Sequence, residues 1–360
     1  MAILRGTAKD TQRSDNGVVG ANSDIIGGLP IKAEPNGIVS GPLVWSGQDF
    51  HGDQTYTLRL SDEEAGEVDS ALTSFKALGL DGDKVSADNF PLPNLSRRLR
   101  ASAEGLYFGR GFFIIRGIDV AKYTTEDSVT IFLGVASYIG DKRGLQDRKG
   151  NMLIRDSANK GGNTYLSSAW TVFNHLFIHE PEVVETLTAP DWPVQLSGRN
   201  ASFYLAPVLT FHNGRLLASL DPHRLGPHPK MNTNIPALSE AQLYALQVVS
   251  DTASRFELQL KLETGDLLFF NNLALVHRRD AYTDDNTSSR HLVRLWLRNQ
   301  KYGWVIPDGM LPPWEAAYGE NRKIRTQYYP IVPMPEYSVP KYTTSSACFV
   351  MQDSESSDGE

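Results

Sequence analysis

Residues 265–280 read GDLLFFNNLALVHRRD, and residues 290–297 read RHLVRLWL. Three apolar runs in these two stretches are too short for helices and predict strands: 267–270, 273–276 and 292–297. Residues 282–289 lie between them and are rich in turn formers. The pattern predicts a buried strand that ends at His277, a polar turn, and a second strand that returns beside the first.

The polar residues of these predicted strands suggest a chemical role. His277 ends one strand, and Arg290 and Arg294 lie on the strand that follows. Imidazole is a common iron ligand, and a guanidinium group holds a carboxylate through two parallel hydrogen bonds. The three side chains could therefore serve a metal and an anionic ligand in one cavity. The spacing alone also allows a core histidine with two arginines on the surface.

The same two stretches resemble the C-terminal signature of the TauD/TfdA family of Fe(II)- and 2-oxoglutarate-dependent dioxygenases. The resemblance implies that His277 is the distal iron ligand and that Arg290 holds the far carboxylate of 2-oxoglutarate. It also places Arg294 where a family arginine often contacts the substrate. A role in strand packing is the alternative for Arg294.

A second segment extends the resemblance. Residues 161–170 read GGNTYLSSAW, and the family has a similar Gly-Gly-Asp-Thr segment whose threonine helps to hold 2-oxoglutarate. The match falls on Thr164, with Asn163 in place of the acid. A strand hydroxyl that bonds locally is the alternative for Thr164. Residues 45–150, which include FPLP and GRGFFIIRGID, resemble the N-terminal half of fungal members of the family.

Composition limits the class of protein and partner. The 360 residues are 41% hydrophobic and 21% charged, which is typical of a globular chain. The net charge of −7 disfavours a nucleic acid partner, since phosphate binding needs an excess of basic residues, and we expect a small-molecule substrate.

The single cysteine, Cys348, excludes a disulfide framework. With no signal-peptide core and no apolar stretch of membrane length, we expect a cytoplasmic protein that does not bind membranes. The oligomeric state stays open.

Helices and short strands are both predicted along the chain. Capping signals and apolar spacing predict helices at 63–78, after a Ser61–Glu64 capping box, and at 95–107, 125–138, 171–178 and 236–256. Strands are predicted at 56–60, 112–115, 203–211, 215–220 and 258–262, with a hairpin turn at 212–214. This pattern indicates an α+β fold with a double-stranded β-helix (jelly roll) core and flanking helices. We expect a flexible arm over residues 1–40, one TauD-like domain over 41–345, and a disordered acidic tail over 346–360.

The iron triad of this family is incomplete in the sequence. Such a triad needs a second histidine and a carboxylate, which a His-x-Asp or His-x-Glu triplet supplies. Of the eight histidines, only His51, with Asp53, has this spacing. It precedes the predicted helices, whereas the family triplet comes later, so we interpret it as part of a polar turn. In the family a few tens of residues with the triplet separate the counterparts of 152–156 and 157–161. Here these two pieces are joined directly, so part of the barrel should be lacking.

Two hypotheses about function follow. In the first, the chain is an Fe(II)- and 2-oxoglutarate-dependent oxidoreductase of a fungal specialised-metabolite or toxin pathway, and one segment has been lost from its translation. It would oxidise a small organic molecule and release succinate and carbon dioxide. In the second, the chain is a degenerate relative that acts as a binding module, because His277 alone cannot hold iron tightly. A hydrolase has little support, since no Gly-x-Ser-x-Gly elbow is present.

Overall fold

The computed structural model describes residues 3–4, 37–145, 153–158, 160–161, 163–196, 202–227, 234–279, 282–283, 289–320 and 327. Most of the predicted arm and the whole acidic tail lie outside these ranges, so the predicted domain division stays a prediction. None of the helices within these ranges has the length and apolar character needed to span a bilayer.

The helices described are α1 Asp62–Ala77, α2 Leu95–Phe108, α3 Thr125–Ser137, α4 Ala169–His179, α5 Pro181–Thr188, α6 Glu240–Phe256 and α7 Pro312–Tyr318. Four of them, α1, α3, α4 and α6, begin after a residue whose side chain caps them. The predicted capping box of α1 is confirmed, because the Ser61 hydroxyl accepts the Glu64 N–H while the Glu64 carboxylate accepts the Ser61 N–H. Ser239 and Gln242 form the same box at α6. Each box pairs two backbone donors that would otherwise have no partner within the helix.

The strands are short and form several small sheets. They are β1 Ile3–Leu4, β2 Thr57–Arg59, β3 Phe112–Arg116, β4 Lys142–Arg143, β5 Leu153–Ala158, β6 Lys160–Gly161, β7 Thr164–Ser168, β8 Trp192–Leu196, β9 Ser202–Ala206, β10 Leu209–His212, β11 Arg215–Ala218, β12 Leu258–Leu260, β13 Leu267–Phe270, β14 Leu275–Arg279, β15 Tyr282–Thr283, β16 Ser289–Arg294 and β17 Trp296–Arg298. Two sheets dominate the centre, with strand orders β12-β7-β14 and β13-β3-β2. The two-residue turn between β10 and β11 confirms the predicted hairpin: Asn213 and Gly214 have φ of 47° and 71°.

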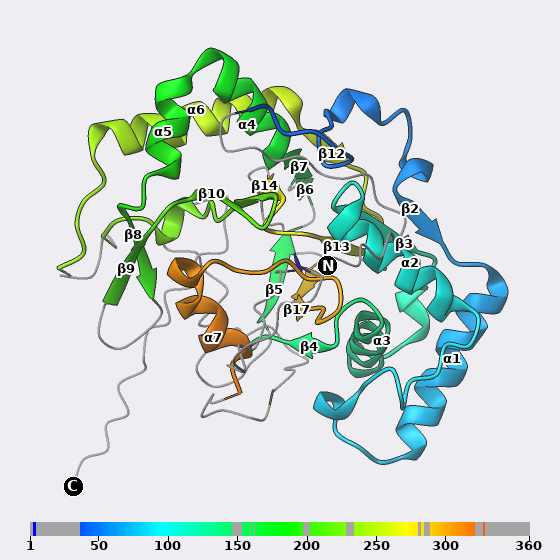
Figure 1. The fold of residues 1–360 in the computed structure, drawn as a ribbon. Helices are drawn as coiled ribbons and strands as arrows, with labels where there is room; N and C mark the ends of the chain where they lie inside the picture. The colour runs from blue at the N-terminus through cyan, green and yellow to red at the C-terminus, as the bar shows by residue number, and fades with distance from the viewer. Residues whose placement is uncertain are drawn as a thin grey trace, which may run out of the picture.

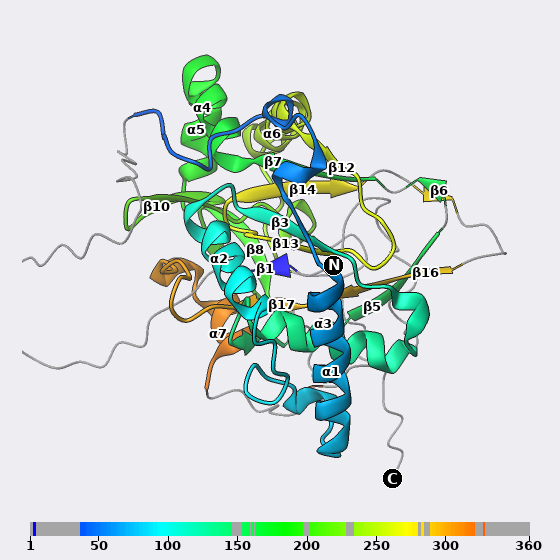
Figure 2. The same ribbon diagram turned by 90° about the vertical axis from the view of Figure 1, so that its right-hand side faces the viewer.

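A long antiparallel ribbon connects the parts of the chain that matter for function. β14, β15 and β16 pair in turn with β7, β6 and β5. Figure 2 shows that the ribbon turns back at β6 and β15, so that β5 and β16 run beneath β7 and β14. A ribbon that folds over on itself is the basis of a jelly roll, as predicted.

Helices cover the outer face of the β12-β7-β14 sheet. Figures 1 and 2 show α4, α5 and α6 stacked above this sheet, with β3 and β13 on its other side. The Ser167 hydroxyl donates to the carbonyl of Ala253 in α6 at 2.9 Å, which ties helix and strand together. On the opposite side, β3 and β13 carry Phe113 and Phe269, whose stacked rings lie 5.1 Å apart in the core.

Several predicted strands have different bounds in the structure: 203–211 is divided into β9 and β10, and two further differences lie close to the predicted site residues. The run 273–276 begins in a turn, and the strand extends from Leu275 through His277 to Arg279. The run 292–297 is not one strand, because the chain changes partners at the buried Leu295: β16 pairs with β5, whereas β17 pairs with β4 and β1. Such corners, where a strand leaves one sheet for another, depend on tertiary pairing rather than on local sequence.

Candidate functional site

The Gly-Asp pair at the start of the signature has a structural role. Gly265 has a φ of +87°, and a Cβ at this position would lie 2.1 Å from the carbonyl oxygen of Ile118. Asp266 follows and receives two hydrogen bonds from the buried Arg116 of β3, at 2.9 and 2.6 Å. The hydrogen bond with Asp266 raises the pKa of Arg116, against the opposing effect of burial. The pair therefore fixes the turn that leads into β13.

A buried asparagine sets the turn between β13 and β14. The Asn271 side chain accepts the Leu273 N–H at 3.0 Å and donates to the carbonyl of Leu106 at 3.2 Å. Its backbone carbonyl accepts the N–H groups of Ala274 and Leu275. Sequence reasoning assigned no role to Asn271, although an Asn-Asn pair between two apolar runs is a turn signal. This turn fixes where β14, and with it His277, begins.

His277 lies on the face of β14 that points away from the covering helices. It pairs with Leu166 of β7, its ring centroid lies 5.0 Å from that of Phe270 in β13, and its side chain is exposed. Its neighbour Arg278 lies on the helix-covered face, where it donates to Glu257 at 2.6 and 2.5 Å and stacks on Tyr165. A histidine directed toward the second sheet and still accessible is placed to bind a ligand there.

Thr164 shares this face with His277. In the register, Arg279 stands opposite Thr164 and His277 stands opposite Leu166, so His277 and Thr164 are diagonal neighbours. Thr164 is 5% exposed, whereas His277 is exposed. The structure thus brings together two of the four predicted site residues, and it adds Arg279 to the same face, which the sequence analysis did not select.

The two predicted arginines, Arg290 and Arg294, lie on β16. Arg290 pairs with Ser157 and Arg294 with Leu153, on the part of the ribbon that turns back beneath β7 and β14. Only the strand position of Arg290 is described. The Arg294 side chain is half-buried, and its guanidinium lies 5.6 Å from the centroid of the Trp296 ring. Both arginines therefore belong to the same ribbon as His277 and Thr164, on its other arm.

The direct junction between Asp156 and Ser157 lies inside a strand. β5 runs from Leu153 to Ala158, and its register with β16 pairs Asp156 with His291 and Ser157 with Arg290. The strand that carries Arg290 therefore pairs with residues on both sides of the position where the resemblance predicts the triplet segment. In this fold one short strand occupies that place.

His51 and Asp53 do not form a metal site. Asp53 lies in a short 3-10 helix, where its carboxylate accepts hydrogen bonds from Arg116 at 2.7 Å and from Arg59 at 3.1 Å. His51 is exposed at the surface. The carboxylate of Asp53 is used in an ion-pair network that joins β2, β3 and the turn before β13.

The described residues do not fit a metal centre with three protein ligands. Within the ranges given above, no three or more His, Cys, Asp or Glu side chains come together in a way that could hold a metal ion. His277 supplies one imidazole, and its neighbours on the same face are Leu166, Thr164 and Arg279. This part of the chain can contribute one iron ligand and polar contacts to a keto acid, but it does not complete a facial triad.

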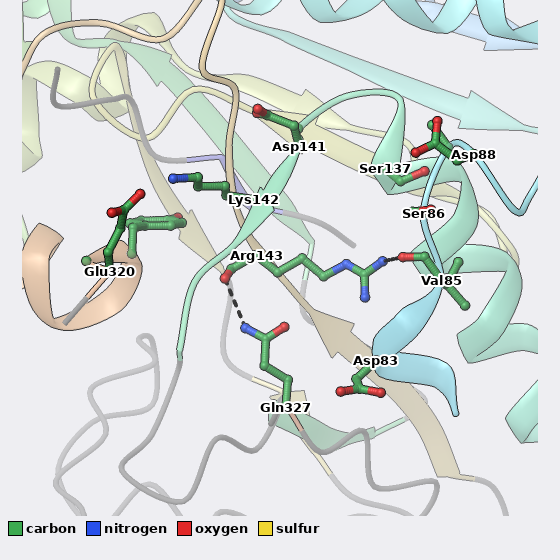
Figure 3. Close-up of a pocket in the computed structure, with 14 residues that line it drawn as sticks. Asp83, Val85, Ser86, Asp88, Ser137, Asp141, Lys142, Arg143, Glu320 and Gln327 are labelled. Carbon is green, nitrogen blue, oxygen red and sulfur yellow. Dashed lines mark hydrogen bonds between the residues drawn. The ribbon is translucent and has the colours of Figure 1, made fainter. Parts of the chain in front are cut away.

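A separate polar pocket lies between α3, β4 and the end of α7. Its volume is about 830 Å³, and Figure 3 shows the Arg143 guanidinium reaching toward Val85 while Gln327 donates to the Arg143 carbonyl at 2.9 Å. The charged residues in its wall are of both signs: Asp83, Asp88, Asp141, Lys142, Arg143 and Glu320. None of the four predicted site residues lines it.

Comparison with known proteins shows which family part of this chain resembles. Residues 152–296 match the model described as taurine catabolism dioxygenase TauD, TfdA family. Over these residues the chain is similar to the TauD/TfdA family. The "taurine hydroxylase-like protein SAT17" of Stachybotrys chartarum is 27% identical over 321 residues, which cover 76% of this chain and 83% of that protein. The "FR-33289 synthase" of Streptomyces rubellomurinus is 24% identical over 320 aligned positions, which cover 76% of this chain and 93% of that protein. Fe(II) and 2-oxoglutarate are the cofactors of this family.

A solved structure supports the fold. An asparagine oxygenase, in a complex with Fe(II), hydroxyasparagine and succinate, superposes with a TM-score of 0.50 at 16% identity, over 70% of this chain and 99% of that one. The alignment with the Stachybotrys protein has 321 positions, whereas 76% of the 360 residues is only about 274, so it contains gaps in this chain.

Proposed function

We propose that this chain is an Fe(II)- and 2-oxoglutarate-dependent dioxygenase that oxidises a small organic molecule in specialised metabolism. The observation that carries the proposal is the common face of His277 on β14 and Thr164 on β7, which are far apart in sequence and diagonal neighbours in the sheet. The relatives support the pathway: one is a fungal taurine hydroxylase-like protein, and the other is named as the synthase of a single compound.

Each predicted site residue has a defined role in this proposal. His277 is a metal ligand, the Thr164 hydroxyl and the Arg290 guanidinium bind the far carboxylate of 2-oxoglutarate, and Arg294 contacts an anionic group of the substrate. The metal supplies the oxidative chemistry in the family. Because the described residues do not complete its ligand set, we assign to this chain only the binding and orientation of the keto acid and the substrate.

The second candidate function is a binding module without turnover. It is favoured by the same observation that leaves the metal centre incomplete: the described residues contain no three-ligand group, and the only His-x-Asp triplet, at His51, has its carboxylate paired with Arg116. A module of this kind would still bind 2-oxoglutarate or a related dicarboxylate through Thr164 and Arg290, with no dependence on iron.

Anaerobic titration distinguishes the two functions. The purified chain is mixed with Fe(II) and 2-oxoglutarate, and the visible charge-transfer band of an iron-bound keto acid is followed. A dioxygenase site gives a band that is lost in His277→Ala and kept in the control His51→Ala. A folded chain with no band, but with metal-independent binding of 2-oxoglutarate by calorimetry, supports the binding module. If a folded chain gives neither the band nor binding of 2-oxoglutarate, the proposal of a keto-acid site is wrong.

A further inference from the structure

Two imidazoles lie side by side on α4, outside the site described above. His175 and His179 are one helical turn apart, and their ring centroids are separated by 4.5 Å with an interplanar angle of 43°. Residues at positions i and i+4 lie on the same side of a helix, so both rings are directed to the same patch of surface. His179 is exposed and His175 is half-buried.

Packing against α6 restricts the inner ring of this pair. The His175 ring meets Phe256, the last residue of α6, edge to face, at a centroid distance of 5.4 Å and an angle of 63°. The outer ring of His179 then lies over the last turn of α4, before Glu180. One imidazole is therefore held in place while the other can adjust, which lowers the loss of side-chain entropy when both contact one ion.

The pair is on the other side of the sheet from His277. α6 contacts the outer face of β7 through the bond between Ser167 and Ala253, and α4 packs with α6 above that face (Figure 1). His277 belongs to the inner face. A metal on α4 would thus be separate from the iron of the family, with the sheet between them.

We propose that His175 and His179 together bind a divalent transition-metal ion of the zinc class on the surface of α4. Paired histidines at i and i+4 on one helix face are the arrangement by which helical zinc motifs provide two of their ligands, and imidazole suits zinc, copper and nickel. No third side chain completes a protein ligand group among the described residues. Water therefore fills the remaining positions, and the site binds the ion without surrounding it.

The test uses the full chain in a His277→Ala background, so that a family iron site cannot contribute. Zn²⁺ alone is titrated by calorimetry in a non-chelating buffer, without 2-oxoglutarate. We expect one ion per chain. His179→Gln removes a direct ligand of the ion. We expect it to weaken zinc binding by roughly 10- to 100-fold or more, because the loss of an outer-shell partner alone has an effect of this size at metal sites. His51→Gln, which removes an exposed histidine far along the chain, should leave the affinity unchanged.

Two results would overturn the proposal: an unchanged affinity in His179→Gln, or an equal loss of binding in His51→Gln. His175→Gln should weaken binding as His179→Gln does, and far-UV circular dichroism reports whether it folds. Should the half-buried His175 prove necessary for folding, the exposed His179 decides the question alone. Because His277 is absent throughout, neither result depends on the proposed dioxygenase function.

Discussion

At the scale of single residues, Gly265 is required by backbone geometry. A side chain there would be strained by the φ of +87° and would meet the Ile118 carbonyl. We predict that Gly265→Ala lowers the free energy of unfolding by about 2 kcal/mol or more. Gly66, inside α1, is the matched control: a Cβ there meets nothing within 4 Å. Gly66→Ala should stabilise by about 0.5–1 kcal/mol. Urea denaturation of both variants checks the prediction, and similar effects at the two positions would contradict it.

The carboxylates around Arg116 should differ strongly in their contribution to stability. Asp266 and Glu263 both contact its guanidinium, at 2.6 and 2.7 Å, but their side chains are 2% and 63% exposed. Asp266→Ala leaves the buried Arg116 guanidinium without its most buried carboxylate partner. We predict that this change lowers the free energy of unfolding by about 3 kcal/mol. The exposed Glu263 is screened by water, so Glu263→Ala should cost about 0–1 kcal/mol. Chemical denaturation measures both, and equal losses would refute this account.

At the scale of elements, one ion pair between α1 and α3 gives a defined pH dependence. Lys76 donates to Asp127 at 2.7 Å, and this bond is the main cause that lowers the pKa of Asp127 below its ordinary value near 3.8. A carboxylate whose pKa is lower in the folded chain than in the unfolded chain stabilises the fold at pH values above its unfolded-state pKa. This stabilisation is lost as the pH falls through the folded-state pKa. The difference in urea midpoint between wild type and Asp127→Asn should therefore shrink below about pH 4. A difference that stays constant from pH 6 to acid would contradict the assignment.

At the scale of the whole molecule, the keto-acid site depends on the ribbon folding back. Thr164 and Arg290 are on different arms of it, and under the proposed function they bind one carboxylate. We predict that Arg290→Ala and Thr164→Val each weaken 2-oxoglutarate binding, and that the guanidinium has the larger effect, of about 1.5–3 kcal/mol. In the double variant the two losses should be non-additive by about 0.5–3 kcal/mol. Calorimetric titration of the four proteins provides the cycle, and strict additivity would place the two residues in separate sites.

Local chemistry made much of the fold predictable. The capping box at Ser61, the Asn213-Gly214 hairpin and the apolar strand of β13 are determined by residues close in sequence, and each is present as predicted. The position of His277 on a strand was also predictable, because a short apolar run precedes it. Its exposure was not, since that depends on which sheet lies opposite.

Sequence by itself determined the family resemblance, the incomplete triad and the direct junction at Asp156, because each is a matter of residue order. Tertiary structure alone decided that Thr164 lies diagonal to His277, that Asp53 pairs with Arg116, and that the junction lies inside β5. Those relations join residues that are far apart along the chain. Their register is set by hydrogen bonding and burial across the sheets, which no local pattern encodes.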